Sequence, residues 1–454
     1  MNIFGKKVNW LLILTSLGFF MAMMDAMIVT TASTAIRLDF QVSVATLQWA
    51  LNAYNITIAA VLLVGVSLGE RWGRRKVYNW GILIFTVGSV LCALAPTMPA
   101  LIAARVVEGV GASVMTPMSM AILTQALPPN ERGRALGIWS GIGGLALIVG
   151  PSLGGVIVAK LAWQWIFWIN VPIGLVAISL SRRHLPESVG QTDRLKLLDA
   201  ILIIVTFTGI ILGLSLSTNL ATPMIARTAL VSGVAGLAAG GWLLWRQAHA
   251  AQPVIPLTLF KSVTFTVGNL ATALLYGSMY GVVFFLPQYF QLGAKATALT
   301  AGLKLLPWTG TLVLIAPFAG RAVDRWGEKW VATLGLFLQG FGYGLIAVLV
   351  QLQKTYSWLV LPLMLAGMGL SMAGPALQKA VLGAVPAIEI GKASGIYNVF
   401  RLFGGALGTA ITVMVFEKFS GGATNPQFMT GFQMALLGTA VISWLGLCWS
   451  LRLR

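Results

Sequence analysis

Long apolar segments recur along the whole chain and are separated by short polar stretches that carry most of the charge. Each segment is long enough to cross a bilayer as a helix, which takes about 20 residues. Fourteen such segments can be placed between Trp10 and the C-terminal end. The predicted spans are residues 8–32, 45–67, 78–95, 99–124, 133–158, 164–181, 198–217, 225–246, 263–289, 298–320, 329–350, 357–380, 391–416 and 431–451.

The composition excludes a soluble domain, because 57% of the 454 residues are hydrophobic and only 9% are charged. Fourteen spans leave loops of roughly ten residues each and no room for a soluble catalytic domain. The two Cys residues fall inside spans, the two His residues are isolated in loops, and no Walker-type phosphate loop occurs. We therefore predict an all-α polytopic membrane protein that is not an enzyme and uses no metal or cofactor.

The formal net charge of +18 would suggest a nucleic-acid partner for a soluble protein, but in this chain it indicates topology. With the N-terminus inside, 21 of the 30 Lys and Arg residues fall on the cytoplasmic side and seven on the outer side. The first span is too long for a cleaved signal peptide and contains Asp25. The prediction is a multi-pass protein of the cytoplasmic membrane, with both termini cytoplasmic and no nucleic-acid partner.

An internal repeat organises the chain. The string Glu-Arg-Trp-Gly-Arg-Arg follows span two, and Asp-Arg-Trp-Gly-Glu-Lys follows span ten. Two six-helix bundles, residues 1–185 and 256–454, with an inserted helix pair in residues 186–255, would place both strings in corresponding cytoplasmic loops. The residues that these loops contribute to the candidate site are Glu70, Arg71, Gly73, Arg74, Arg75, Asp324, Arg325 and Gly327.

The first of these strings resembles the loop motif Gly-x-Leu-Ala-Asp-Arg-x-Gly-Arg-Lys of the major facilitator superfamily. Two positions depart from it, since Val66 stands in place of Gly and Glu70 in place of Asp. The resemblance implies a major facilitator fold with 14 transmembrane helices, and a charge network that latches the cytoplasmic side. The simpler alternative is a basic anchor that only fixes topology.

Two further strings narrow the resemblance. Gly150-Pro151-x-x-Gly154-Gly155 in span five resembles the antiporter signature of the superfamily, although small residues also allow close helix packing by themselves. Residues 163–172, which enter span six, resemble the string of the fourteen-helix drug:proton antiporters, the QacA-like and EmrB-like multidrug exporters. An aromatic interface belt would explain the Trp residues of this string but not the Asn-x-Pro that follows them.

Few ionisable residues lie well inside spans, namely Asp25, Arg105, Glu108 and Arg401. Charges in hydrocarbon are costly enough to be candidates for function. Asp25 and Arg105 lie at similar predicted depth, and Glu108 shares a helix face with Arg105. Two acids and one base leave one carboxylate without a permanent counterion, so it must hold a proton or a cation. The alternative is a structural Arg105–Glu108 pair, with Asp25 facing a wet cavity.

The family resemblance agrees with these positions in part. Asp25 matches the membrane Asp of the first helix, and Arg105 matches the Arg-x-x-x-Gly motif of the fourth, but Glu108 replaces the usual Gln. This extra acid leaves open which carboxylate carries the proton.

The function predicted from these features is proton-coupled efflux of amphipathic small molecules, with cations expected, by alternating access. Asp25 and Glu108 would bind protons or cations, and Arg105 would tune their protonation. Three alternatives stay open: a porter for a nutrient or metabolite, a membrane-embedded enzyme or respiratory subunit, and a receptor without transport. The expected partners are a lipophilic small-molecule substrate, protons and the lipid bilayer, with the chain as a monomer.

Overall fold

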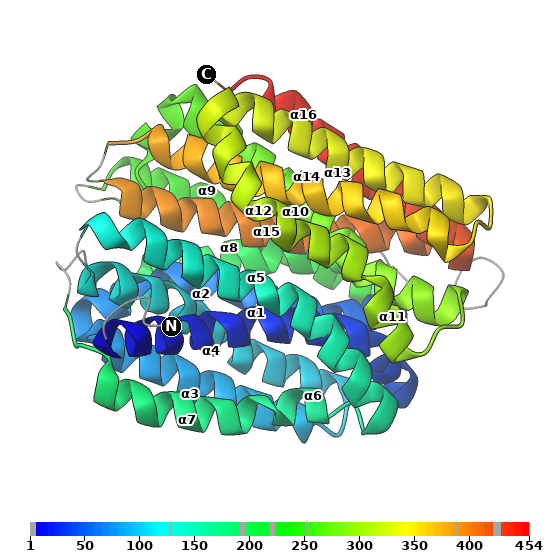
Figure 1. Cartoon of the computed structure of the whole chain (residues 1–454), viewed down its shortest axis with the longest axis horizontal. Coiled ribbons are helices and arrows are strands. Elements are labelled where there is room, and N and C mark those ends of the chain that lie inside the picture. The colour runs from blue at the N-terminus through cyan, green and yellow to red at the C-terminus, as the bar shows by residue number, and fades with distance from the viewer. Residues whose placement is uncertain are drawn as a thin grey trace. The chain divides into compact units, whose positions relative to one another are not determined.

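The computed structural model describes residues 6–127, 129–189, 197–217, 223–250, 253, 255–386, 389–420 and 428–453. Within these ranges the regular secondary structure is entirely helical (Figure 1). Part of the predicted loop between spans six and seven, residues 190–196, lies outside the described residues, as does the C-terminal Arg454.

The chain forms two compact units. The first comprises residues 1–42, 49–200 and 297–303, and the second comprises residues 43–48, 201–296 and 304–454. The helices centred in the first unit are α1 (Lys6–Phe40), α2 (Val44–Trp72), α3 (Arg74–Ala93), α4 (Met98–Ala126), α5 (Pro129–Lys160), α6 (Trp165–Trp168), α7 (Asn170–His184) and α11 (Ala298–Lys304).

The second unit holds the remaining helices. They are α8 (Leu197–Leu216, which begins in the first unit), α9 (Pro223–Ala248), η1 (Leu257–Lys261), α10 (Val263–Gln288), η2 (Tyr289–Gly293), α12 (Leu306–Trp326), α13 (Glu328–Gln351), α14 (Tyr356–Gly383), α15 (Ile390–Ser420) and α16 (Phe428–Ser450). Whether residues 186–255 form an inserted pair between two six-helix bundles stays a prediction.

The predicted spans correspond to the helices. Thirteen helices of the described chain are long and apolar enough to cross a membrane, and the count reaches 14 when the two parts of α2, bent by 49°, are taken as one span. Two of the predicted spans, which remain single membrane-crossing helices, contain one residue at which the α-helical hydrogen bonding lapses, Ile169 between α6 and α7 and Leu305 between α11 and α12, although both residues keep right-handed helical backbone angles. Pro307 explains the second lapse, because proline has no backbone N–H and is favoured in the first turn of a helix.

Glycine sets the closest helix contacts. A Cβ on Gly88 of α3 would lie 2.6 Å from the Cα of Glu108 on α4, and one on Gly111 would lie 2.3 Å from the backbone N of Phe85. In the second unit, Gly342 of α13 approaches Pro362 of α14 in the same way. Only glycine permits such backbone contact, so these positions fix how deeply α3 packs on α4 and α13 on α14.

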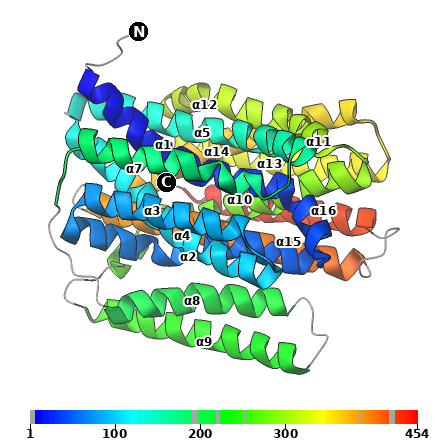
Figure 2. The ribbon, with the colours of Figure 1, turned by 90° about the horizontal axis from the view of Figure 1, so that it is seen from below.

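Helices α8 and α9 form a pair that lies side by side in Figure 2. Gly209 and Gly213 of α8 face Gly236 and Gly233 of α9, with Cβ positions that would fall within 3 Å of the opposite backbone for all but Gly233. The outer surface of α9 is apolar and exposed at Leu230, Leu237 and Trp245, the first of which is 68% exposed.

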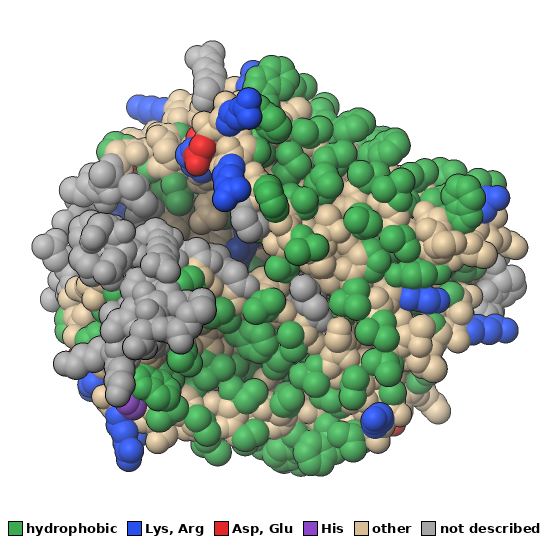
Figure 3. Space-filling model, in the orientation of Figure 1, with side chains coloured by type: hydrophobic (Ala, Val, Ile, Leu, Met, Phe, Trp, Pro, Cys, Tyr) green, Lys and Arg blue, Asp and Glu red, His purple; other side chains and the backbone are tan. Residues whose placement is uncertain are grey.

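Hydrophobic side chains cover much of the face in Figure 3. Apolar exposure of this extent is expected for a surface that faces lipid rather than water. The helices are therefore those of a multi-pass membrane protein.

Candidate functional site

The intramembrane charges of the first unit meet at Arg105 on α4. Its Nη1 atom donates to Asp25 Oδ2 of α1 at 2.5 Å and to Glu108 Oε2 of α4 at 2.6 Å. The three side chains are at most 1% exposed. Asp25, which was predicted to lie at a similar depth to Arg105, binds it directly, so the pair considered for Arg105 and Glu108 has a third, fully buried member.

Helix α2 holds the other side of the guanidinium. Arg105 Nε donates to the backbone oxygen of Ala50 at 3.1 Å, and the ring of Tyr54 lies 4.1 Å from Arg105 Cζ. Ala50 and Tyr54 are four residues apart and therefore lie on one face of α2. The Tyr54 hydroxyl donates to the backbone oxygen of Ala22 on α1 at 3.0 Å, which ties α2 to the helix that carries Asp25.

Helix α3 surrounds Glu108. The Ser89 hydroxyl donates to Glu108 Oε1 at 2.5 Å, and Cys92 Sγ lies 3.4 Å from Oε2. Asn170 of α7 donates to the Ser89 hydroxyl at 3.2 Å. The close approach of Gly88 to Glu108 brings these donors within reach.

The two carboxylates differ in how completely they are bound. Both oxygens of Glu108 accept hydrogen bonds, whereas Asp25 Oδ1 is buried and accepts none from the described residues. With both acids ionised the cluster carries one net negative charge, which is costly in an apolar interior. Asp25 Oδ1 is therefore the position where a proton would complete the cluster.

The first repeated loop is a network of charges around the turn from α2 to α3. Glu70 Oε1 accepts from Arg74 Nη2 at 2.7 Å, and Arg74 also donates to Gln125 of α4. Gly73 has a positive φ of +100°, a backbone conformation that favours glycine. Glu187, from the segment after α7, accepts from the backbone N–H groups of residues 75 and 76 at 3.0 and 3.2 Å. This carboxylate caps the N-terminus of α3, where the helix dipole favours a negative charge.

The second loop uses a different charge order. Lys379 of α14 bonds Asp324 at 2.8 Å and Glu328 at 3.4 Å, and Gly327 has φ +79°. Lys379 stands at the same repeat offset from Gln125 as Asp324 does from Glu70. In the first loop the cation that binds the acid is Arg74 of α3, the helix directly after the turn. In the second loop it is Lys379 of α14, which follows the helix after the turn. The other candidate residues of the loops are Arg71 and Arg325, both exposed, and Arg75, which lies 3.5 Å from Glu187.

The Gly-Pro-x-x-Gly-Gly string of α5 lies at a helix crossing. Cβ atoms on Gly150 and Gly154 would fall 2.7 and 2.9 Å from Met27 and Ile28 of α1, the helix that carries Asp25. Gly155 faces the backbone of α11, and Gly302 of α11 faces Pro151 in return. The motif is therefore packed against backbone on its α11 side and against side chains and backbone on its α1 side, and small residues are required on both.

The string at residues 163–172 has a buried side formed by Trp163, Ile166, Phe167 and Asn170, which an interface belt alone does not explain. Trp163 is 6% exposed and its Nε1 donates to Asp39 at 2.8 Å, while Trp165 is 51% exposed. Phe167 lies 5.8 Å from Arg105 Cζ, and Asn170 bonds Ser89. The string thus contributes directly to the surroundings of the charge cluster.

Arg401 does not join this cluster and lies in the second unit, on α15. Its Cζ is 5.5 Å from the ring centroid of Tyr276 on α10. The side chains of Tyr280 and Tyr397 also interact with it electrostatically.

The sequence of residues 15–409 matches the family model of the Major Facilitator Superfamily. Curated relatives include the multidrug resistance protein Stp of Mycobacterium tuberculosis, 29% identical over 92% of this chain and 77% of Stp. The methylenomycin A resistance protein of Streptomyces coelicolor is 30% identical over 89% of this chain and 84% of its own length. The riboflavin transporter RibZ of Clostridioides difficile is 31% identical over 91% of this chain and 89% of RibZ.

Solved structures show the same fold. A POT family transporter in complex with a thioalcohol-conjugated peptide superposes with a TM-score of 0.73, at 18% identity, over 99% of this chain and 97% of that one. The xylose transporter XylE from E. coli gives a TM-score of 0.66, at 12% identity, over 98% of this chain and 97% of XylE.

Proposed function

The chain belongs to the major facilitator superfamily, and we propose that it exports amphipathic, cationic small molecules across the cytoplasmic membrane in exchange for protons. Members of this superfamily are transporters and not enzymes. Relatives named for multidrug, methylenomycin A and tetracenomycin C resistance support export as the direction of transport.

The observation that carries the proposal is the pair of buried carboxylates on one guanidinium nitrogen. A proton on Asp25 makes the cluster neutral, and its loss leaves one negative charge that a cationic substrate can balance. Proton and substrate cation then compete for the same charge, which is the minimum that antiport requires. Because Glu108 is fixed by donors from α3 and α4 whereas Asp25 Oδ1 accepts no hydrogen bond from the described residues, we assign the proton to Asp25.

Arg105 positions both acids and links them to α2 through Ala50 and Tyr54. A change in the protonation of Asp25 alters its bond to Arg105 and therefore the contact between α1 and α4. The glycine crossing of α1 and α5 lies within three residues of Asp25, at Met24, Met27 and Ile28. Helix α1 is thus the element that would transmit protonation to packing. In the same scheme the charge networks at Glu70 and Asp324 are the latches of the cytoplasmic side.

A second candidate function is transport of a nutrient or metabolite, which the similarity to the riboflavin transporter RibZ favours. The two functions differ in coupling and in substrate charge.

Reconstitution into proteoliposomes separates the two functions. With the membrane potential clamped by valinomycin and potassium, an acidic lumen should drive accumulation of ethidium by the wild-type protein. The Asp25→Asn variant should lose this accumulation while reaching normal levels in the membrane. Accumulation of riboflavin without any response of ethidium to the pH gradient would favour the second candidate.

A further inference from the structure

Arg401 is an intramembrane base with no acid beside it among the residues that the structure describes. It lies well inside α15, and none of its partners among the described residues is a carboxylate. This contrasts with Arg105, which contacts two. An unpaired charge inside a membrane protein is expensive, so it is retained where it serves a ligand or an ion pathway.

Tyrosines from two helices surround the guanidinium. Tyr276 and Tyr280 are four residues apart on α10 and therefore share a face, and Tyr397 is four residues before Arg401 on α15. A Cβ on Gly374 of α14 would lie 3.3 Å from the Tyr276 hydroxyl, and the Tyr397 hydroxyl donates to the Gly374 backbone oxygen at 3.3 Å. The tyrosines that neighbour the guanidinium therefore lie where α10, α14 and α15 meet inside the second unit.

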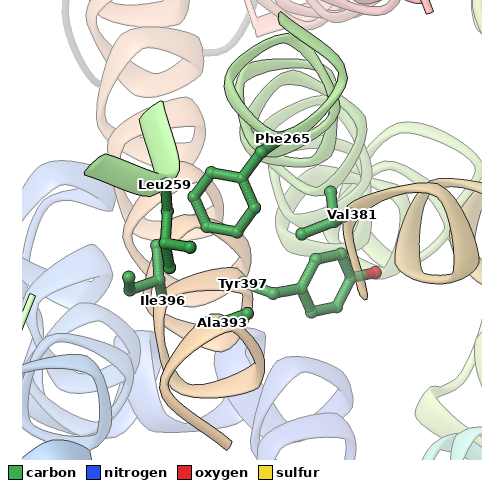
Figure 4. Close-up of a cluster of buried hydrophobic side chains, with 6 residues drawn as sticks. All are labelled: Leu259, Phe265, Val381, Ala393, Ile396 and Tyr397. Carbon is green, nitrogen blue, oxygen red and sulfur yellow. The ribbon is translucent and has the colours of Figure 1, made fainter. Parts of the chain in front are cut away.

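One side of this junction is closed by apolar packing. Tyr397 belongs to a buried cluster with Leu259, Phe265, Val381, Ala393 and Ile396, and its hydroxyl points away from Leu259 and Ile396 in Figure 4. Arg401 lies one helical turn beyond this cluster, where Tyr276, Tyr280 and Arg401 itself remain partly exposed. The exposed groups are thus a cation, phenol hydroxyls and aromatic rings.

These groups match a planar ligand that carries an anionic group. A guanidinium binds a carboxylate in a bidentate manner, and tyrosine rings stack on aromatic systems while their hydroxyls donate hydrogen bonds. We propose that Arg401, with Tyr276 and Tyr280, binds a carboxylate of the transported molecule, so that aromatic zwitterions are better substrates than plain cations of the same shape. This inference rests on the proposed export function and specifies its substrate class.

The test compares rhodamine B, whose free carboxylate makes it a zwitterion, with its ethyl ester, which is a plain cation. Binding of each dye to the purified protein is measured by fluorescence polarisation. The wild-type protein should prefer rhodamine B, and Arg401→Gln should reduce that preference by about 10-fold or more, the value of a charge-assisted hydrogen bond. Affinity for the ester should stay unchanged or rise.

Arg401→Lys is the matched control, because it keeps the charge but loses the bidentate geometry and should retain part of the preference. Tyr276→Phe removes one hydroxyl and should reduce affinity for rhodamine B less than Arg401→Gln does. Because no acid in the described part of the chain pairs with Arg401, Arg401→Gln should also unfold at the wild-type temperature or above it. A misfolded Arg401→Gln protein would show that this residue is structural and would overturn the proposal.

Two other results are decisive. An unchanged ratio of the two affinities in folded Arg401→Gln would overturn the binding role of Arg401 and leave the export function standing, provided that ethyl ester transport responds to the pH gradient. Failure of the wild-type protein to bind either dye would contradict both the binding role of Arg401 and the proposed export function.

Discussion

Arg105 compensates two carboxylates through a single nitrogen, and this makes the three residues unequal in their effects on stability. Removing either acid leaves one base with one acid, which is a neutral pair. Removing the base leaves two acids in a buried site with no cation beside them. Loss of a negative charge from the cluster should therefore be tolerated, whereas loss of its positive charge should be harmful.

We therefore expect Arg105→Gln to lower the free energy of unfolding by about 3–5 kcal/mol, the usual result of breaking a buried ion pair from one side. Asp25→Asn should have little effect or raise stability. Thermal unfolding in detergent measures which of the two variants is less stable. The charge account would be wrong if Asp25→Asn were the less stable protein.

Glu108→Gln tests whether the second acid is needed for its charge or only for its shape. Gln can accept from Arg105 with its oxygen and donate to Ser89 with its nitrogen, so the variant should fold. Its cluster is neutral without a proton, and we expect proton-driven ethidium accumulation to be lost. Ser89→Ala, which removes a hydrogen bond but no charge, should keep accumulation at a reduced rate. Wild-type accumulation by folded Glu108→Gln would limit Glu108 to a structural role.

The charged members of this site could be predicted from the sequence, because ionisable residues inside apolar spans are rare enough to stand out. Tyr54, Ser89 and Cys92 could not, since neutral polar and aromatic residues occur in nearly every span and only helix packing selects those that face Glu108 and Arg105. Asn170 had a partial signal, as the Asn-x-Pro string was not explained by an interface belt. Glu187 had none, because an acid in a polar loop is ordinary.

At the scale of elements, the two turns with glycine in a left-handed conformation allow a direct comparison. Gly73 and Gly327 occupy corresponding loop positions, with φ of +100° and +79°. A Cβ on Gly73 would also lie 2.7 Å from Glu187 Oε1, whereas nothing lies within 4 Å of one on Gly327. Gly73 thus serves both backbone geometry and the capping of α3.

Gly73→Ala should therefore destabilise the protein more than Gly327→Ala. Gly327→Ala should cost about 1–2 kcal/mol from backbone strain alone, and Gly73→Ala should add the loss of the Glu187 cap, about 1 kcal/mol. Glu187→Ala should account for that difference when it is measured alone. The interpretation of Glu187 as a cap would be contradicted by equal effects of the two glycine variants in thermal unfolding.

Local lapses in helical hydrogen bonding show where the sequence pattern is insufficient. The spans at 164–181 and 298–320 have continuous apolar character and each forms one membrane-crossing helix, but the α-helical hydrogen bonding lapses locally at Ile169 and Leu305. Hydropathy reports the length of an apolar segment but not its backbone conformation, which depends on packing and on proline at positions such as 307. The bend in α2 is likewise invisible to hydropathy.

For the whole molecule, the count of apolar segments and the repeated loop string were sufficient to predict the membrane class and the major facilitator fold. Orientation in the membrane stays a prediction that rests on the excess of Lys and Arg on one side.

Reporter fusions test this orientation. Fusions after Arg454 and within residues 181–197 should both report a cytoplasmic location, and a fusion after Ser217, between α8 and α9, should report an external one. A cytoplasmic signal after Ser217 would contradict the inserted helix pair and leave twelve spans.

The central claim is that a proton and a substrate cation exchange at one buried charge. Proton release on substrate binding tests it most directly: ethidium, a permanent cation, is added to the detergent-solubilised protein in weakly buffered solution at a series of pH values. The account predicts that wild-type protein releases up to about one proton per bound ethidium within some interval of pH, and that Asp25→Asn releases none at any pH. Ethidium binding without proton release by the wild-type protein, or equal release by Asp25→Asn, would contradict it.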